Sequence, residues 1–533
     1  MASIAIQGYT VRGINNVKVR LFPQVLGIHK VHEHNLCNAL RDFGLMLKSE
    51  CRNELLKYNY DFLKFAHTMR SSELCMIAHG YSILELNDKD WWDKFTSVAS
   101  QCSYDMDGKE IAGLLYSLSN VYKGKNPLID KLIRESTPWI QHASPATLSL
   151  LVKVIANLNI RGNYLNNINK RAIEIIDQLN MVDVIFFITS NTEAKTHDME
   201  LYRALCMRAI QLYDDMELHH LRALAASLSV GGYKCHIFFN VLAMRLAEIA
   251  KKKKLRDGDI ISLFLAFTSQ KFLTQNDLCI DTKVYKDFIR ERMDVVTKDR
   301  FVFPVPELGP VLVDALRDNI HRITANGMPI VLRAISILKL PVEAELYNNI
   351  IEKTAGYISE EMYDGLKLSN LVVTVAKRRE RQDCFWEAVH EIFQSKGKLL
   401  DPDHVAKMTA TLTTVNDDER KLAVYRDLVK LSLAHCKGMS AKSLFAITRV
   451  FVTNTETEAL TSDEYTDAVI RLVDTVTLSE TYNLLKLLPL RMLPKDDKNV
   501  SRLLEAARKK LHASNTDNSC YRLMESLLEG VTG

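Results

Sequence analysis

The feature that most constrains this 533-residue chain is an apolar pattern that returns about every 37 residues. The stretch IAGLLYSLSN, residues 111–120, has apolar side chains at its first, fourth, fifth and eighth positions. This spacing is that of a helix with one buried face. The same stripe starts at positions 36, 74, 111, 148, 182, 221, 260, 331, 368, 405, 444 and 481. Successive starts lie 34 to 39 residues apart, except for one step of 71, which is close to two units.

A second helical pattern follows each stripe, as in LYRALCMRAIQLYDDM at residues 201–216. Turn-prone segments separate the two patterns, so each unit is predicted to be a helix hairpin. A single hairpin cannot bury its apolar face, and neighbouring hairpins must therefore stack. The sequence predicts an all-α superhelical solenoid of about 12–13 two-helix repeats of ~37 residues.

The domain boundaries follow from the places where the pattern fails. The stretch FVFPVPELGP, residues 301–310, holds Pro304, Pro306 and Pro310, and we expect these prolines to exclude a helix. Residues 295–327 are thus predicted to be a degenerate repeat or Pro-rich insertion between two solenoid halves, 31–294 and 328–533. Residues 1–30 form an N-terminal extension that is basic and free of acidic residues. This composition is typical of a mitochondrial targeting segment, and equally of a short basic tail on a cytosolic protein.

Composition narrows the functional classes. The net charge of +4, from 69 basic and 65 acidic residues, permits a polyanion partner without requiring one. The ten cysteines include no C-x-x-C pair, which argues against a zinc site and favours a reducing compartment. No apolar run approaches the roughly 20 residues of a membrane-spanning helix, so no membrane insertion is expected.

The sequence contains none of the common catalytic motifs, whether a phosphate loop, a G-x-G-x-x-G turn, an H-E-x-x-H helix or a G-x-S-x-G elbow. His32 and His34 flank Glu33, and we interpret them as polar helix-entry residues rather than metal ligands. We expect no enzymatic activity, no metal and no cofactor.

Polar side chains recur at the tenth position of the stripe, on the helix face opposite the core. Asn120, Asn157 and Asn191 occupy this position. In RNA readers that recognise one base per repeat, short amides bond the edges of unstacked bases. An Asn near a helix end also caps the helix or opens a turn, and both interpretations fit these three residues.

Basic side chains supply the second set of candidates. Four consecutive lysines repel one another, and a phosphate backbone would relieve that repulsion. Cations at helix C-termini are also stabilised by the helix dipole, which needs no ligand. The candidate phosphate contacts are Lys153, Arg222, Lys252, Lys253, Lys254, Arg256, Lys377, Arg378, Arg379 and Arg449.

The stretches LLYSLSN, residues 114–120, and LVKVIAN, residues 151–157, resemble the first helices of heptatricopeptide-type repeats. Octotricopeptide proteins are close cousins of these organellar RNA-binding proteins, which are related to RAP-domain and FAST-kinase-like proteins. The resemblance covers about residues 36–510 and rests on period and stripe. The chain departs from the family in lacking a C-terminal RAP domain and a PPPEW-type signature. The resemblance implies a role in mitochondrial or plastid RNA processing, translation or ribosome assembly.

We therefore expect a non-catalytic helical-repeat protein of the mitochondrial matrix, or otherwise of the cytoplasm. It would grip single-stranded or ribosomal RNA along its concave face, in organellar RNA metabolism or ribosomal RNA assembly. Other proteins of a ribonucleoprotein assembly would be further partners. The alternative is a protein–protein interaction scaffold of HEAT or armadillo type, because a solenoid offers a long surface to any partner.

Overall fold

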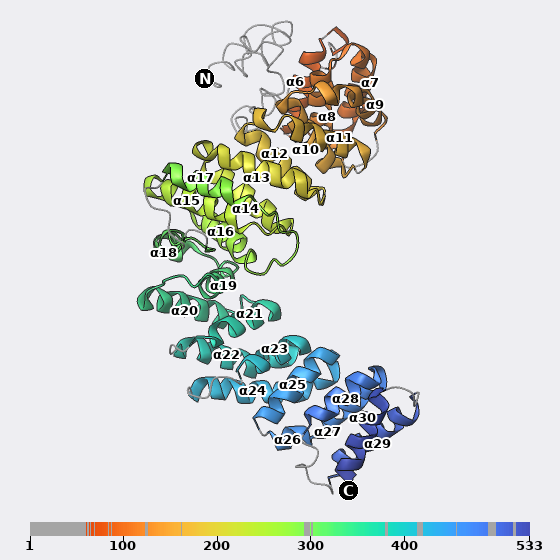
Figure 1. Cartoon of the computed structure of the whole chain (residues 1–533), viewed down its shortest axis with the longest axis vertical. Helices are drawn as coiled ribbons and strands as arrows, with labels where there is room; N and C mark the ends of the chain where they lie inside the picture. Colours follow the sequence, from red (N-terminus) through yellow and green to blue (C-terminus); the bar gives the residue numbers. More distant parts are fainter. Residues whose placement is uncertain are drawn as a thin grey trace. The chain divides into compact units, whose positions relative to one another are not determined.

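The structure, a computed structural model, is all-α, with helices following one another in chain order (Figure 1). It describes residues 60–532, except 61–62, 64–65, 69, 84, 87, 123–125, 161, 293–298, 300–301, 379–381, 413–418, 455, 489–496 and 515–518. Within these residues there is no strand, only an isolated bridge between Lys234 and Asp277. The predicted all-α solenoid is confirmed. The stripe that starts at position 36, the extension 1–30, and His32 and His34 lie outside the described residues.

The predicted stripes from position 74 onward all lie within helices, which we call the first helices. They are α6 (Ser71–Ile83), α8 (Gly108–Val121), α10 (Pro145–Leu158), α12 (Met181–Glu193), α14 (Leu218–Val230), α16 (Asp257–Ser269), α19 (Met328–Leu338), α21 (Gly365–Ala376), α23 (Pro402–Leu412), α25 (Ala441–Thr453) and α28 (Leu478–Leu487). In every first helix except α12, the stripe begins three residues after the helix does. Side-chain caps fix several of these starts, such as Asp107 before α8 and Ser144 before α10.

The predicted register of α12 was wrong by two residues. Its buried stripe is Val184, Phe187, Ile188 and Asn191, all with 0% exposure. The predicted residues Val182, Ile185 and Phe186 are only partly buried. With the stripe starting at 184, the steps to its neighbours at 148 and 221 become 36 and 37 residues. The repeat is therefore more regular than the sequence pattern suggested.

Every first helix is followed by a second helix, and one second helix, α18, has no first helix before it. The second helices are α7 (Lys89–Cys102), α9 (Pro127–Ser136), α11 (Asn163–Glu174), α13 (Met199–Gln211), α15 (His236–Lys252), α17 (Thr282–Arg292), α18 (Leu308–Asn319), α20 (Ala344–Ser359), α22 (Asp383–Lys396), α24 (Glu419–His435), α27 (Asp463–Thr475) and α29 (Lys498–His512). A one-turn helix, α26 (Thr457–Leu460), precedes α27, and α30 (Ser519–Thr532) packs on α28 and α29.

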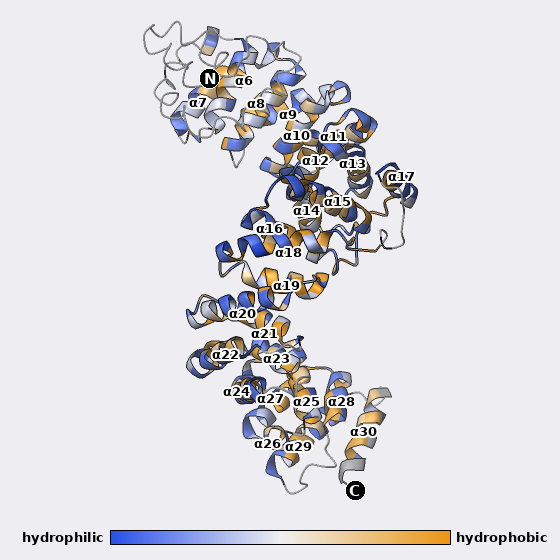
Figure 2. Ribbon diagram, turned by 90° about the vertical axis from the view of Figure 1, so that its left-hand side faces the viewer, coloured by the Kyte–Doolittle hydropathy of each residue, from blue (hydrophilic) through white to orange (hydrophobic). Residues whose placement is uncertain are grey.

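The helices form two compact units. Unit 1 comprises residues up to 254 together with 265–311, and unit 2 comprises 255–264 together with 312–533. In unit 1, first helices α6, α8, α10, α12 and α14 each pack on the next. In unit 2, first helices α19, α21, α23, α25 and α28 form one such row, and second helices α20, α22, α24, α27 and α29 form another. Apolar residues supply this packing, and Figure 2 colours α19 mostly as hydrophobic.

The 71-residue step reflects a missing first helix. Helices α17 and α18 occupy the places of two successive second helices, and the described residues 302–307 between them are not helical. Phe303 anchors this segment within unit 1: its ring stacks on His236, with centroids 4.5 Å apart, and its carbonyl accepts from the Lys271 Nζ at 2.5 Å. Pro304 and Pro306 lie in this segment, as predicted. The prediction was wrong for Pro310, which lies in the first turn of α18, where no intrahelical donor is lost.

Basic side chains of one second helix donate hydrogen bonds to carbonyls at the C-terminal end of the preceding second helix. The last carbonyls of a helix have no partner within it, and a cation nearby stabilises them. Lys353 on α20 donates to the Ile320 carbonyl after α18 at 2.8 Å. Arg245 on α15 donates to the Met216 carbonyl after α13 at 2.9 Å. Many basic side chains are therefore engaged in the scaffold.

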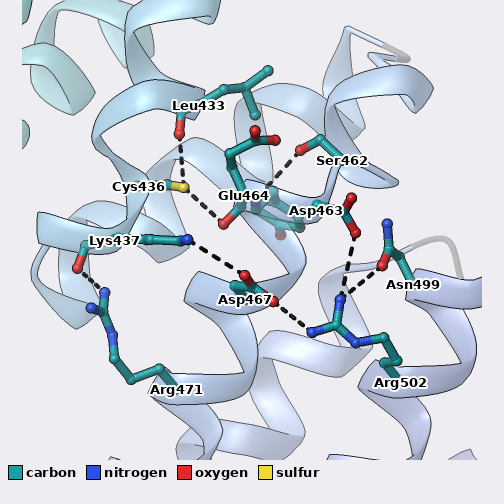
Figure 3. Close-up of polar contacts among 11 residues, drawn as sticks. Leu433, Cys436, Lys437, Ser462, Asp463, Glu464, Asp467, Arg471, Asn499 and Arg502 are labelled. Atoms are coloured by element: carbon teal, nitrogen blue, oxygen red, sulfur yellow. Dashed lines mark hydrogen bonds and ion pairs between the residues drawn. The ribbon is translucent and has the colours of Figure 1, made fainter.

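Figure 3 shows the same kind of contact among residues that lie on or next to α24, α27 and α29 of unit 2. Arg471 on α27 donates to the carbonyl of Lys437, which follows α24. Lys437 Nζ lies 3.5 Å from Asp467 Oδ2, and Arg502 on α29 reaches Asp467 Oδ1 at 2.6 Å. The hydrogen bond from Arg502 lowers the pKa of Asp467 below its ordinary value. These cations are paired and leave little charge for a ligand.

Candidate nucleic-acid interface

The structure brings two of the predicted asparagines together. Asn157 on α10 donates its Nδ2 to Asn120 Oδ1 at 2.8 Å and to Ser119 Oγ at 3.0 Å, both on α8. Asn120 also hydrogen-bonds Tyr116, which partly offsets the raised pKa that burial gives this tyrosine. All four side chains belong to the packed surface between neighbouring first helices. The two asparagines therefore join repeats, and they do not form a row of free amides.

The third predicted asparagine does not belong to this row. Because of the register correction, Asn191 is the eighth residue of its stripe and is fully buried. It exchanges hydrogen bonds with Asn169 on α11, at 3.0 and 3.4 Å, and accepts from Thr196 Oγ1 at 2.8 Å. Its Nδ2 also donates to the Phe187 carbonyl at 3.0 Å. Asn191 is a core amide with every polar atom engaged, so its placement at the surface was wrong.

The tenth position of the corrected α12 stripe is Glu193, and this residue pairs with a predicted RNA contact. Lys153 Nζ on α10 lies 2.6 Å from Glu193 Oε2 on α12. The pair neutralises the charge of Lys153 on this face. Arg222, the other predicted cation on a first helix of unit 1, is exposed on α14. Charge on the first helices of unit 1 is therefore balanced.

The lysine cluster lies at the end of a second helix. Lys252 is the last residue of α15, and Lys253 and Lys254 follow it, all exposed. The Lys253 amide closes the helix by donating to the Ile249 carbonyl at 2.9 Å. Arg256, also exposed, stands immediately before α16. The helix dipole stabilises cations at a helix C-terminus, so this position agrees with the interpretation in which the lysines need no ligand.

The remaining predicted cations lie in unit 2. Lys377 follows α21 and is exposed, whereas the Arg378 guanidinium sits 4.3 Å from the centroid of the Tyr347 ring. Arg449 is exposed on α25. Arg379 lies outside the described residues. Of these residues, Arg449 is an exposed cation on a first helix and Lys377 is an exposed cation directly after one.

The structure reveals a larger set of cations around Arg449 that the sequence search missed. The five first helices that lie wholly in unit 2, α19, α21, α23, α25 and α28, carry six basic residues and two acidic ones. We call the six the basic first-helix face: Arg333, Lys367, Lys407, Lys442, Arg449 and Lys486. All are exposed except Lys367, which is half-buried. Four of them lie at the third or sixth stripe position, opposite the buried stripe: Arg333, Lys407, Arg449 and Lys486. Lys367 and Lys442 lie one and two residues before their stripes begin.

The two acidic residues on these helices are engaged at helix starts. Asp403 accepts from the Ser440 amide at 2.9 Å. Glu480 accepts from the amide and hydroxyl of Thr477, and these bonds hold its pKa below the ordinary value. The first helices α6, α8, α10, α12 and α14 of unit 1 instead carry three basic and four acidic residues. Excess positive charge on first helices is thus a property of unit 2.

Hydrogen bonds between repeats show that the basic first-helix face is continuous over neighbouring helices. Lys407 Nζ on α23 donates to Asn370 Oδ1 on α21 at 2.9 Å, and both residues hold the third stripe position. Lys367 Nζ on α21 donates to Asn326 Oδ1 before α19 at 3.0 Å. Counting charges helix by helix would have revealed this face, whereas the net charge of the whole chain concealed it.

Two further chemical features are absent from the described part of the chain. It contains no group of three His, Cys, Asp or Glu side chains that could hold a metal ion. None of its helices is both long enough and apolar enough to span a membrane.

Comparison with known proteins gives one family match. Residues 48–256 match the model of the family described as RESC6, RNA-editing substrate-binding complex 6 protein. The match covers less than half of the chain and lies almost wholly in unit 1. No curated protein matches the chain. Among solved structures, it is similar to one titled "Homology model of the full-length AP-3 complex in an intermediate open conformation", with 10% identity and a TM-score of 0.34. That alignment covers 99% of this chain and 97% of the other, but a TM-score this low does not show that the two chains share a fold.

Proposed function

We propose that this protein is a non-catalytic RNA-binding subunit of a ribonucleoprotein assembly, and that RNA contacts the basic first-helix face of unit 2. The observation that carries the proposal is the run of six cations along five stacked first helices, which themselves carry only two acidic residues, both engaged at helix starts. Of the six, Lys367 is paired with Asp364, which precedes α21, at 3.4 Å. A row of exposed cations attracts the phosphates of a nucleic acid and releases their counterions. Aromatic side chains beside such a row add stacking. Tyr482 supplies one, with Lys486 Nζ 5.8 Å from its ring centroid.

The family match supports the same class of function. The description of that family places its members in an RNA-editing substrate-binding complex. We infer for this chain a role in organellar RNA processing, with RNA editing as the first process to examine. The acid-free, basic N-terminal segment supports a mitochondrial matrix location. The heptatricopeptide relationship and ribosomal RNA assembly remain narrower versions of the same proposal.

Ultraviolet crosslinking tests the proposed interface. The full-length chain would be crosslinked to a 30-nucleotide single-stranded RNA of mixed sequence, and the crosslinked peptides would be identified by mass spectrometry. We expect crosslinks on α19, α21, α23, α25 and α28. Crosslinks confined to unit 1 would contradict the assignment of the face. The absence of a mobility shift at low salt and micromolar RNA would contradict RNA binding itself.

A protein scaffold is the second candidate, and the surface of unit 1 favours it. The outward face of α14 ends in Val230, which is 80% exposed, and Leu265 on the next first helix is 53% exposed. Isolated exposed apolar residues are common, but these two follow the neutral row formed by Asn120, Asn157 and the Lys153–Glu193 pair. Loss of all RNA binding with retained association to partner proteins would favour the scaffold.

A further inference from the structure

Unit 2 contains a cavity that the RNA proposal does not use. Its volume is about 180 Å³, and it lies where α20 ends, α21 begins and α22 ends. The apolar residues around it are Ile358, Leu368, Ile392, Leu399 and Leu400. An engineered cavity of roughly 150 Å³ lined by aliphatic side chains binds benzene, so this volume suits one large apolar group.

One residue of the cavity wall carries a polar group that lacks a partner among the described residues. The hydroxyl of Tyr363 is buried and makes no hydrogen bond in the structure. Desolvation raises the pKa of this hydroxyl, which keeps it protonated as a donor. Buried donors without an acceptor are rare, because the lost hydration is not replaced. A ligand whose entry shifts the Tyr363 side chain enough to expose its hydroxyl, and which brings a carbonyl oxygen beside its apolar group, would satisfy both features.

The surface beside the cavity is also apolar. Leu399, a wall residue, is 83% exposed. Met362 and Leu366, which lie in sequence between wall residues, are 55% and 52% exposed. Clustered exposed apolar side chains mark interaction surfaces more strongly than scattered ones do. The apolar area continues outside the cavity, so the ligand must be larger than a single small molecule.

The charges at the cavity are already balanced. Lys396 and Glu361, both wall residues about half exposed, form an ion pair with each other. Such a pair gives a polar rim and offers no free cation to a phosphate. The walls are aliphatic apart from Tyr363, whereas single bases are held by stacking between aromatic rings. These two observations favour a polypeptide over a nucleic acid.

We propose that this cavity is a docking socket for one large apolar side chain, carried by an amphipathic segment of a partner protein. The inserted Leu, Met or Phe fills the space between Ile358, Leu368 and Ile392. A main-chain carbonyl next to it accepts from Tyr363, and neighbouring apolar residues of the segment cover Leu399 and Met362. The socket gives the chain a protein contact that does not depend on RNA binding.

The first experiment asks whether the cavity admits an apolar group. The full-length chain, labelled with ¹³C at isoleucine δ1 methyls, would be titrated with benzene and followed by methyl NMR. We expect shifts for Ile358 and Ile392 and none for Ile168, which is buried in α11 of unit 1. Substitution Ile392→Phe fills the cavity and should abolish the shift at Ile358. No shift at Ile358 or Ile392, or equal shifts at Ile168, would overturn the socket.

The second experiment identifies the occupant. Twelve-residue peptides would be selected by phage display on the immobilised chain, and their affinities measured by fluorescence anisotropy. We expect peptides with one Leu, Met or Phe anchor that bind at least ten-fold more weakly to the Leu399→Asp and Ile392→Phe variants. The matched control, Leu523→Asp, changes an equally apolar residue of α30 that is 51% exposed and should leave affinity unchanged.

Tyr363→Phe tests the predicted hydrogen bond. It should weaken the selected peptides by about five-fold, the usual worth of one hydrogen bond, with unchanged circular dichroism. Peptides that bind Leu399→Asp and Ile392→Phe as well as they bind the original chain would overturn the proposal. Displacement of benzene by a single-stranded RNA oligonucleotide would also overturn it, because the occupant would then be a base.

Discussion

The basic first-helix face gives a quantitative prediction about salt. The variant Lys407→Gln, Lys442→Gln, Arg449→Gln and Lys486→Gln removes four exposed cations from three neighbouring first helices. Each cation that neutralises a phosphate of a single strand contributes about 0.7 to the slope of log affinity against log salt. If the six residues of the face all make contacts, the slope of the original chain is about −4, and that of the variant about −1.4.

The same relation sets the loss of affinity. At 0.1 M salt each contact contributes about five-fold relative to 1 M, so four contacts contribute roughly 600-fold. The assay is fluorescence anisotropy of a labelled 30-nucleotide single-stranded RNA, titrated with the full-length chain at salt concentrations between about 0.05 and 0.3 M. Because these side chains are exposed and form no ion pair within the part of the chain that the structure describes, the variant should keep the thermal midpoint of the original chain.

A matched variant separates position from total charge. Lys398→Gln, Arg426→Gln, Lys430→Gln and Lys498→Gln also removes four exposed cations of unit 2, but on or beside second helices. We expect its slope to stay within about one unit of the original, since these cations touch no phosphate of the bound strand. Equal losses in the two variants would refute the reasoning, because binding would then depend on net charge alone.

Three further predictions concern the scaffold. Asn191→Ala should lower the free energy of unfolding by about 2 kcal/mol, measured by urea denaturation, because it leaves the buried Asn169 amide without its main partner. RNA affinity should not change, and a selective loss of RNA binding would restore Asn191 as a base contact. Burial raises the pKa of Tyr164 to about 12, so its stabilisation is complete below pH 10 and is lost as the pH rises towards 12. Tyr164→Phe should flatten the alkaline limb of a thermal-midpoint profile, and an unchanged limb would contradict this. Burial also raises the pKa of Cys436 to about 11, so iodoacetamide at pH 8 should modify the exposed Cys279 and spare Cys436, as peptide mass spectrometry would show.

The fold could be predicted because stacking leaves a signal in every repeat. Ten of the first helices begin three residues before the stripe read from the sequence. The exception, α12, has apolar residues at nearly every position from 181 to 188, so two registers fit its stripe equally well. The deciding signal was a cap: Asn180 and Asp183 form a capping box that starts the helix at Met181. Asp183 is buried and accepts from Ser149 Oγ at 2.7 Å, a contact 34 residues away that the sequence alone does not display.

The candidate site was harder to predict because pairing between repeats decides which charges remain. Lys153 and Arg449 hold the same sixth position of their stripes, yet Lys153 is paired with Glu193, whereas Arg449 is exposed and forms no ion pair with a described residue. The partner of Lys153 became visible only with the corrected register of α12. Asn120 and Asn157 likewise engage each other. Residue type and stripe position thus identified outward side chains, but their neighbours in the adjacent repeat determined what those side chains could bind.

The two units are built from the same helix-hairpin repeat, but the outward positions of their first helices carry different side chains. The buried stripe and the cations between second helices account for stacking in both, so the outward first-helix positions are left for other interactions. In unit 1 these positions are tied across repeats, as in Asn157 with Asn120. In unit 2 they hold cations that repel one another over contiguous helices, and such a field weakens the folded state unless an anion relieves it. Stacking alone does not require that arrangement. The charge on the first helices of unit 2 is therefore the feature of this chain that most needs a ligand to explain it, and the phosphate backbone of the proposed RNA would relieve the repulsion.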